Sequence, residues 1–170
     1  MDAKTHWEKV YATKAPKAVS WYRPHLETSL ALIERAAAGY SASIIDVGGG
    51  ESTLVDDLLA RGYENITVLD VSQIAIDVTK KRLGLAAEQH RAAHVQQVGH
   101  AVKPGGHVIV STFGPEGPTK CSGLDVVRYD AESLHDQFGV RFRLVKSSKE
   151  LHRTPFGTTQ QFLFYYCKVE

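Results

Sequence analysis

The stretch Ile44-Ile45-Asp46-Val47-Gly48-Gly49-Gly50-Glu51-Ser52 decides the fold that we expect for this chain. A short apolar run that ends near an acid predicts a buried strand, and the three glycines predict a tight turn directly after it. Glycine tolerates positive φ and, because it has no Cβ, lets a ligand approach the backbone closely. The helical pattern that follows would offer unpaired N–H groups to that ligand. The stretch therefore predicts a strand, a ligand-binding turn and a helix.

A second strand follows the first within the length of a βαβ unit. Between them the pattern predicts a helix over residues 52–61, and residues 65–70 are apolar, β-branched and end in an acid. This acid, Asp70, follows Gly50 by about 20 residues, and in dinucleotide-type folds a carboxylate with that spacing accepts hydrogen bonds from ribose hydroxyls. A carboxylate suits a cis-diol because it can accept from both hydroxyl donors.

Asp70 has an alternative role, which is to cap the helix that we predict over residues 73–84. Ser72 is better placed for the cap, since it directly precedes that helix. Ile74 and Val78 are then expected to face inward. Asp70 remains available for a ligand under this interpretation.

The rest of the chain predicts helices and then strands. The expected elements are helices over 4–12, 25–38, 89–103 and 131–138, and strands over 107–113, 141–151 and 160–169. The last two strands form a predicted antiparallel hairpin, with Phe162, Phe164 and Tyr166 on one face and Leu163, Tyr165 and Cys167 on the other. Trp21 and Tyr22 lie in an irregular segment and either seal the edge of the core or form a flap over a ligand.

Composition indicates one globular domain over residues 1–170, with N-terminal helices and a flap (1–40), a cofactor-binding βαβ part (41–84) and the C-terminal half of the sheet (85–170). The net charge of +1 gives no argument for a nucleic-acid partner. Cys121 and Cys167 lack metal-site spacing. No apolar leader or membrane-length apolar run is present, so we expect a cytoplasmic protein without a metal or membrane partner.

Taken together, the motifs make the chain similar to a class I S-adenosylmethionine-dependent methyltransferase. The residues that carry the resemblance are Asp46-Val47-Gly48-Gly49-Gly50-Glu51-Ser52, Leu69-Asp70-Val71-Ser72 and Val102-Lys103-Pro104-Gly105-Gly106-His107-Val108-Ile109, in the order of the family's motifs. The terminal hairpin is also typical of the family, and His6–Tyr11 with Val19–Tyr22 resemble the entry segment of its small-molecule and protein-lysine subgroup. The resemblance implies an α/β, Rossmann-like methyltransferase sheet.

The resemblance also implies a cofactor and the residues that hold it. The cofactor is S-adenosyl-L-methionine, with S-adenosyl-L-homocysteine as product. The implied cofactor-binding residues are Asp46, Val47, Gly48, Gly49, Gly50, Ser52, Asp70, Val71, Ser72 and, in the flap, Trp21. Ser52 replaces the family's third glycine and can still cap the following helix.

The resemblance implies that the methyl acceptor is a small molecule or a protein side chain, and it indicates no catalytic residue. Candidates for contact with the acceptor are Tyr22, Arg128, Tyr129, His152 and Arg153. Arg128 with Tyr129 would suit an anionic group, because arginine pairs with carboxylates through two parallel hydrogen bonds. For each candidate the alternative is an ordinary loop or packing residue.

The chain departs from the family pattern in the middle. Residues 73–106 read as helix or turn, whereas the family places two further strand–helix units there, which need about 60 residues. The third and fourth strands are thus absent from this sequence. If the chain is this short, the first strand must pair with the fifth, or a domain-swapped homodimer must complete each sheet.

Two other functions compete with methyl transfer. The first is a cofactor-binding remnant or structural dimer without turnover, because the segment that usually faces the methyl group is missing. The second is an NAD-dependent oxidoreductase, which fits the glycine turn and Asp70 but not the terminal hairpin.

Overall fold

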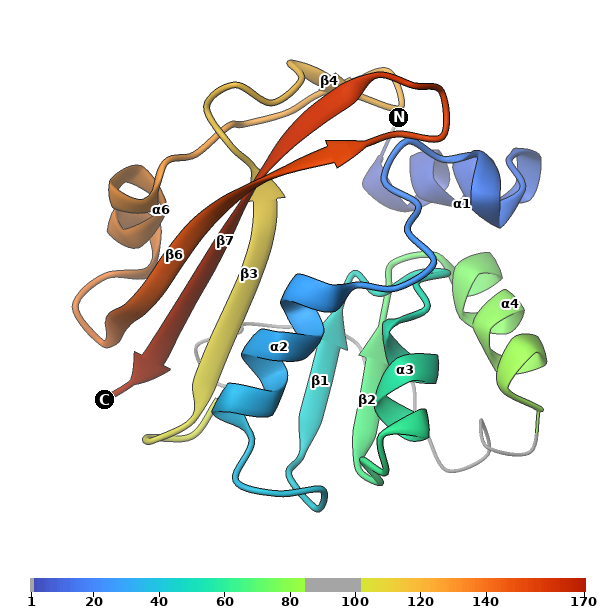
Figure 1. Cartoon of the computed structure of the whole chain (residues 1–170). Helices are drawn as coiled ribbons and strands as arrows, with labels where there is room; N and C mark the ends of the chain where they lie inside the picture. The colour runs from blue at the N-terminus through green and yellow to red at the C-terminus, as the bar shows by residue number, and fades with distance from the viewer. Residues whose placement is uncertain (1, 85–101) are drawn as a thin grey trace. The chain divides into compact units, whose positions relative to one another are not determined.

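The computed structural model describes residues 2–84 and 102–170, which belong to two compact units (Figure 1). We call residues 2–84 the N-terminal unit and residues 102–170 the C-terminal unit. Most of the helix expected over 89–103 lies outside the described residues.

The N-terminal unit contains a strand–turn–helix–strand unit with helices before and after it. Its elements are α1 (Ala3–Thr13), the 3₁₀-helix η1 (Pro16–Ala18), α2 (Glu27–Ala36), β1 (Ile44–Val47), α3 (Leu54–Ala60), β2 (Ile66–Leu69) and α4 (Gln73–Leu83). Strand β1 pairs with β2 in parallel, and Val47 lies opposite Leu69. The carboxyl ends of both strands therefore meet at one edge, which confirms the arrangement predicted from the glycine stretch.

The core of this unit is built from α2, α3, β2 and α4. The buried residues in contact are Leu30, Leu54, Val55, Leu58, Tyr63, Ile66, Val68 and Ile76. On α4 the buried residues are Ala75, Ile76 and Thr79, whereas Ile74 is 36% exposed. The inward position predicted for Ile74 is therefore wrong. The polar Thr79 takes a buried place that an apolar pattern does not reveal, because its hydroxyl is hydrogen-bonded there.

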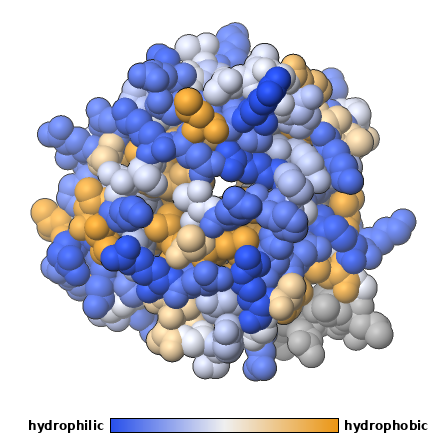
Figure 2. All heavy atoms as spheres, in the orientation of Figure 1, coloured by the Kyte–Doolittle hydropathy of each residue, from blue (hydrophilic) through white to orange (hydrophobic). Residues whose placement is uncertain are grey.

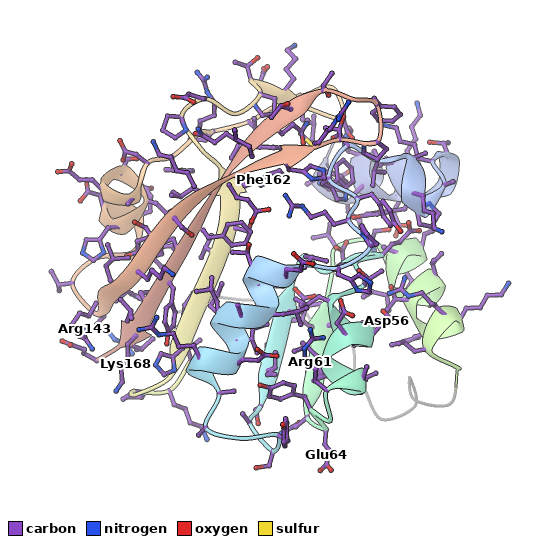
Figure 3. All side chains as sticks on the ribbon, in the orientation of Figure 1. Asp56, Arg61, Glu64, Arg143, Phe162 and Lys168 are labelled. Carbon is purple, nitrogen blue, oxygen red and sulfur yellow. The ribbon has the colours of Figure 1, made fainter. Side chains whose placement is uncertain are left out.

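The C-terminal unit is an antiparallel sheet with one helix packed on it. Its elements are β3 (His107–Phe113), β4 (Lys120–Cys121), β5 (Leu124–Asp125), α6 (Ala131–Phe138), β6 (Phe142–Arg153) and β7 (Thr159–Val169). The strand order is β3-β7-β6, with both pairings antiparallel, and β4 and β5 form a separate two-stranded antiparallel sheet. The predicted hairpin is confirmed, and Arg143 and Lys168, labelled in Figure 3, lie opposite each other on it.

Strand β7 alternates as the sequence predicts. Leu163, Tyr165 and Cys167 pack with Leu134 of α6 in one buried cluster. The ring of Phe138 stacks on Tyr165 with centroids 5.7 Å apart. Because side chains alternate along a strand, Phe162, Phe164 and Tyr166 lie on the opposite face.

The expected missing strands fall between β2 and β3. Within the described residues 70–84 and 102–106, α4 is present and no strand is assigned. Every described helix is too short or too polar to cross a lipid bilayer. The surface in view in Figure 2 is mainly hydrophilic, with hydrophobic residues distributed among hydrophilic ones.

Candidate functional site

The glycine turn is fastened to the end of the neighbouring strand. The N–H groups of Gly48 and Gly49 both donate to the carbonyl oxygen of Leu69, at 2.7 and 3.2 Å. Gly48 and Gly50 have φ values of +74° and +51°, in the left-handed region that glycine adopts without strain. The turn is thus a rigid continuation of the β1–β2 pair.

Helix α3 begins later than the sequence pattern predicts. It starts at Leu54, because Gly49 and Ser52 first close a tight turn through a 2.8 Å hydrogen bond from the Ser52 N–H. The N-cap of α3 is Thr53, not Ser52 as expected, and its side chain makes no capping hydrogen bond; the Ser52 hydroxyl, one residue earlier, accepts from the Leu54 N–H at 3.1 Å. The N–H groups of the first two glycines serve the protein itself, which limits what the turn offers to a ligand.

Two of the glycines lie so close to other side chains that an added Cβ would meet them. A Cβ on Gly49 would lie 2.6 Å from Asp46 Oδ2 and 2.7 Å from a methyl group of Val68. A Cβ on Gly50 would contact Tyr11 Oη and would lie 3.3 Å from Asp70 Oδ2. The turn therefore lets side chains from three different elements approach its backbone.

Two carboxylates lie beside this turn. Burial raises the pKa of Asp46 to about 6, and the charge of Asp70 adds to the rise. Burial also raises the pKa of Asp70, although N–H groups of Ser72, Gly50 and Val71 oppose the shift. Asp70 Oδ1 accepts from the Ser72 N–H at 2.8 Å. The edge of the sheet thus holds concentrated negative charge, which favours hydroxyl donors or a cation as a ligand.

Helix α4 fixes the turn from one side. The buried Thr79 hydroxyl donates to the Gly50 carbonyl at 2.8 Å. One turn later, the Arg82 guanidinium donates to the carbonyl of Glu51 at 3.0 Å and to that of Ser52 at 2.6 Å. The same guanidinium pairs at 2.9 Å with Asp56 of α3, and Asp56 is labelled in Figure 3. Three consecutive carbonyl groups are therefore held by two side chains of α4.

Helix α1 reaches the same site. Glu8 accepts hydrogen bonds at the start of α4, and Tyr11 lies against Gly50. The ring of Trp7 contacts the ring of Trp21 edge to face, with centroids 5.7 Å apart. Trp21 is thus packed on α1, and both rings are partly exposed.

The structure gathers the predicted cofactor residues in the N-terminal unit. Val47 is the last residue of β1 and Gly48 follows it, Asp70 and Val71 follow β2, and Ser72 is the N-cap of α4, with its hydroxyl accepting from the Ala75 N–H. The cap predicted at Ser72 is confirmed. Val47 and Val71 are 51% and 54% exposed, so apolar surface adjoins the carboxylates.

The predicted acceptor residues lie in different places. Tyr22 is in the N-terminal unit, where its N–H donates to the Val19 carbonyl. Arg128 donates to the Pro115 carbonyl at 3.0 Å. Tyr129 packs against the core of the C-terminal unit.

The other two acceptor candidates are neighbours on β6. His152 is buried beside Phe162, whereas Arg153 is exposed. Because they are consecutive in a strand, they lie on opposite faces of the sheet.

Sequence reasoning missed four residues around the turn, namely Glu8, Tyr11, Thr79 and Arg82. Glu8 and Tyr11 are spaced i, i+3 on α1, and Thr79 and Arg82 are spaced i, i+3 on α4, so the two members of each pair lie on one face of their helix. This i, i+3 spacing is visible in the sequence, but it is too common in helices to identify a functional site. Among the described residues, no group of three His, Cys, Asp or Glu side chains is arranged to hold a metal ion.

Comparisons with known proteins agree on the fold. No family model matches the chain. Bovine eEF1A lysine and N-terminal methyltransferase is 31% identical over 77 residues, which are 45% of this chain and 11% of that protein. The chain thus matches about a tenth of this relative's length.

Solved structures match over a larger share. A SAM-dependent methyltransferase from Anabaena variabilis has a TM-score of 0.74 at 14% identity, covering 100% of this chain and 96% of its own. The 1,6-didemethyltoxoflavin-N1-methyltransferase of Burkholderia thailandensis, solved with S-adenosylhomocysteine, has a TM-score of 0.60 at 15% identity, covering 98% and 84%. The fold is therefore that of the class I S-adenosylmethionine-dependent methyltransferases.

Proposed function

We propose that this chain binds S-adenosyl-L-methionine at the glycine turn and transfers its methyl group to an acceptor. The observation that carries the proposal is the meeting of Gly50 and Asp70, where a Cβ on the glycine would lie 3.3 Å from the carboxylate. A glycine backbone without a side chain, next to a carboxylate at the same edge of the sheet, suits a nucleoside, because the carboxylate can accept hydrogen bonds from both ribose hydroxyls.

The charge of the site supports a sulfonium ligand. Asp46 and Asp70 place two carboxylates beside the turn, and a bound cation would lower the cost of keeping both ionised. When bound, the cofactor supplies an activated methyl group, which leaves as the sulfonium becomes a neutral thioether. The acceptor's nucleophilic atom forms the new bond and loses its proton to solvent or a base. The chain's own residues bind and orient the partners.

We propose Asp46 to Gly50, Ser52, Asp70, Val71 and Ser72, with Trp21 of the flap, as the cofactor-binding residues. Tyr22, Arg128, Tyr129 and one of His152 and Arg153, which lie on opposite faces of β6, remain proposed contacts for the acceptor. The acceptor is a small molecule or a protein side chain. The bovine relative is named for a protein substrate and the Burkholderia neighbour for a small heterocycle, so both acceptor classes are supported.

The test is calorimetry with S-adenosylmethionine and S-adenosylhomocysteine, followed by an assay of S-adenosylhomocysteine release with panels of small amines, heterocycles and peptides. Binding with turnover is the expected result. Binding without turnover on every panel would favour a cofactor-binding remnant or structural dimer. Binding of NADH without affinity for S-adenosylhomocysteine would favour an oxidoreductase and would overturn the proposal.

We further propose that the two units belong to one cytoplasmic methyltransferase domain with a shortened middle, and that a domain-swapped homodimer completes its sheet. The support is the sequence between Ser72 and His107, which is too short for the family's two additional strand units. Intact mass spectrometry of the purified chain with light scattering tests both points. A monomeric mass with a compact X-ray scattering profile would exclude the swapped dimer.

A further inference from the structure

The sheet of the C-terminal unit has two outer edges that differ in chemistry, with β7 between them (Figure 1). Strand β6 forms one edge, and its pairing is interrupted by a register shift between Leu144 and Lys146. Its basic side chains are Arg143, Lys146, Lys149 and Arg153. Strand β3 forms the other edge, pairs with β7 in continuous register and contains no Asp, Glu, Lys, Arg or Pro. Bulges and charged side chains keep edge strands from pairing, so the edge of β6 is protected and that of β3 is not.

The backbone of β3 directs hydrogen-bonding groups toward this unprotected edge. The Gly114 N–H and the Gly106 carbonyl both bond to β7, at 3.0 and 2.8 Å. Because backbone groups alternate in direction along a strand, the even-numbered residues of β3 face β7. His107, Ile109 and Ser111 therefore direct their N–H and C=O groups outward. We call these outward groups the open edge of β3.

The open edge ends after Ser111. The next outward residue is Phe113, and its carbonyl already accepts from the Tyr129 N–H at 3.0 Å. A strand that pairs with the open edge therefore has a defined upper limit.

Strand β1 of the N-terminal unit presents a matching edge. The Ile44 N–H donates to the Asn65 carbonyl at 2.9 Å, on the side of β2. By the same alternation, Ile45 and Val47 direct their N–H and C=O groups away from β2. Their side chains are apolar and about half exposed, at 47% and 51%. Both β1 and β3 thus have an uncharged outward edge.

We infer that β1 of a second copy of this chain pairs in parallel with the open edge of β3. The inference rests on the proposed homodimer and names the two strand edges that form it. Each chain contributes a β1 edge and a β3 edge, so two copies satisfy all of these edges in one closed dimer. A self-pairing β6 edge is disfavoured instead, because its basic side chains would lie near one another.

The outward groups define the register. In a parallel pair, each outward residue bonds to the residues on either side of its opposite residue, as Ile44 does on β2. Ile45 of the second copy then donates to the His107 carbonyl and accepts from the Ile109 N–H. Val47 donates to the Ile109 carbonyl and accepts from the Ser111 N–H.

The same register places apolar side chains together. Ile45 lies opposite Val108, and Val47 lies opposite Val110. Val108 is buried in the cluster that includes Leu134 of α6, and Val110 packs against that cluster. Apolar cross-strand neighbours of this kind stabilise a sheet.

The first experiment places proline on each outer edge of the sheet. Proline is tolerated where an edge N–H points outward, so Ser111→Pro removes a donor of the open edge and leaves the bonds to β7. Lys149→Pro is the matched control, because Lys149 is also exposed and outward: Thr154 faces β7 through its N–H, so odd-numbered residues beside it face away. Light scattering over a concentration series should show a dimer for the unaltered chain. Ser111→Pro should weaken dimerisation about tenfold or more, and Lys149→Pro should leave it unchanged.

The second experiment tests the register by disulfide formation and does not depend on the proline variants. The whole chain with Val47→Cys and Val110→Cys is oxidised and analysed on a non-reducing gel. A covalent dimer is expected. The unaltered chain, which carries Cys121 and Cys167, is treated in the same way and should stay unlinked.

The outcomes separate this inference from the proposed methyl transfer. A monomeric mass for the unaltered chain, or equal dimerisation of the two proline variants, would overturn the inference. A disulfide within one chain would put the chain's own β1 on the open edge and exclude the second copy, and the absence of any disulfide would exclude the register. Calorimetry with S-adenosylhomocysteine on the same samples tests the cofactor site independently of the dimer.

Discussion

Replacing Gly50 by alanine tests whether the glycine turn is the cofactor site. Gly50 has a φ of +51°, and its new Cβ would contact the Tyr11 hydroxyl and lie 3.3 Å from Asp70 Oδ2. Gly62→Ala is the matched control, because Gly62 also has positive φ, at +91°, but nothing lies within 4 Å of its Cβ position. Both substitutions strain the backbone, and only the first places a methyl group in the proposed site.

The expected cost to stability is similar for the two variants. An alanine in the left-handed region costs about 1–2 kcal/mol. The reduced freedom of the unfolded chain returns about 0.4–1 kcal/mol, so the net loss is about 1 kcal/mol. That corresponds to about 4–8 °C in melting temperature for a unit of this size. The Tyr11 hydroxyl is the end of a flexible side chain and can swing away, so the clash at Gly50 adds little to the cost of folding.

Ligand binding should separate the two variants. Thermal unfolding followed by circular dichroism checks the stabilities, and calorimetry with S-adenosylhomocysteine checks the affinities. We expect Gly50→Ala to lose at least tenfold in affinity, because the methyl group displaces Tyr11 and blocks approach to the backbone. Gly62→Ala should bind as the unaltered chain does. Equal affinity in the two variants would refute the assignment of the site to this turn.

Three further predictions concern the residues around the turn. The pKa of Asp46 is about 6 in the folded chain and lower in the unfolded chain, so the contribution of this carboxyl group to stability is fully present below pH 4, and about 3 kcal/mol of it is lost as pH rises through 6. Asp46→Asn should remove this pH-dependent loss, which denaturant titrations at several pH values would measure. Parallel pH profiles for the variant and the unaltered chain would contradict the prediction. Thr79→Val should lower the free energy of unfolding by about 1–3 kcal/mol, since the buried Gly50 carbonyl loses its donor; an unchanged urea midpoint would count against this. Arg82→Lys should cost about 1–3 kcal/mol, because lysine cannot span two carbonyl groups and a carboxylate, and should be detected as a lower melting temperature.

Much of the fold was predictable because it depends on neighbours in sequence. The alternation along β7 separates Leu163 from Phe162, and the structure places the former in the core beside α6. The capping residue Ser72 is likewise recognised from a short pattern, and its side chain accepts from a helix N–H group as expected. Local rules sufficed at these positions because each partner is only a few residues away.

The surroundings of the turn were not predictable in the same way. The apolar pattern favoured Ile74 as an inward residue of α4, but the structure buries Thr79 there instead, because its hydroxyl has a partner in the turn. Arg82 looks like an ordinary charged surface residue in the sequence, yet it holds two carbonyl groups of a loop 30 and 31 positions earlier. Hydrogen bonds of this range leave no periodic signal.

The strand, the glycine turn and the acid after the second strand follow from the sequence alone, because backbone sterics and side-chain periodicity act over a few residues. The contact of Tyr11 with Gly50 and the capping of α4 by Glu8 could be seen only in the folded chain. Those contacts join elements far apart in the chain, and they form only when packing of the core brings α1, α4 and the turn together. The turn can therefore be predicted from the sequence, whereas the side chains that surround it are known only from the fold.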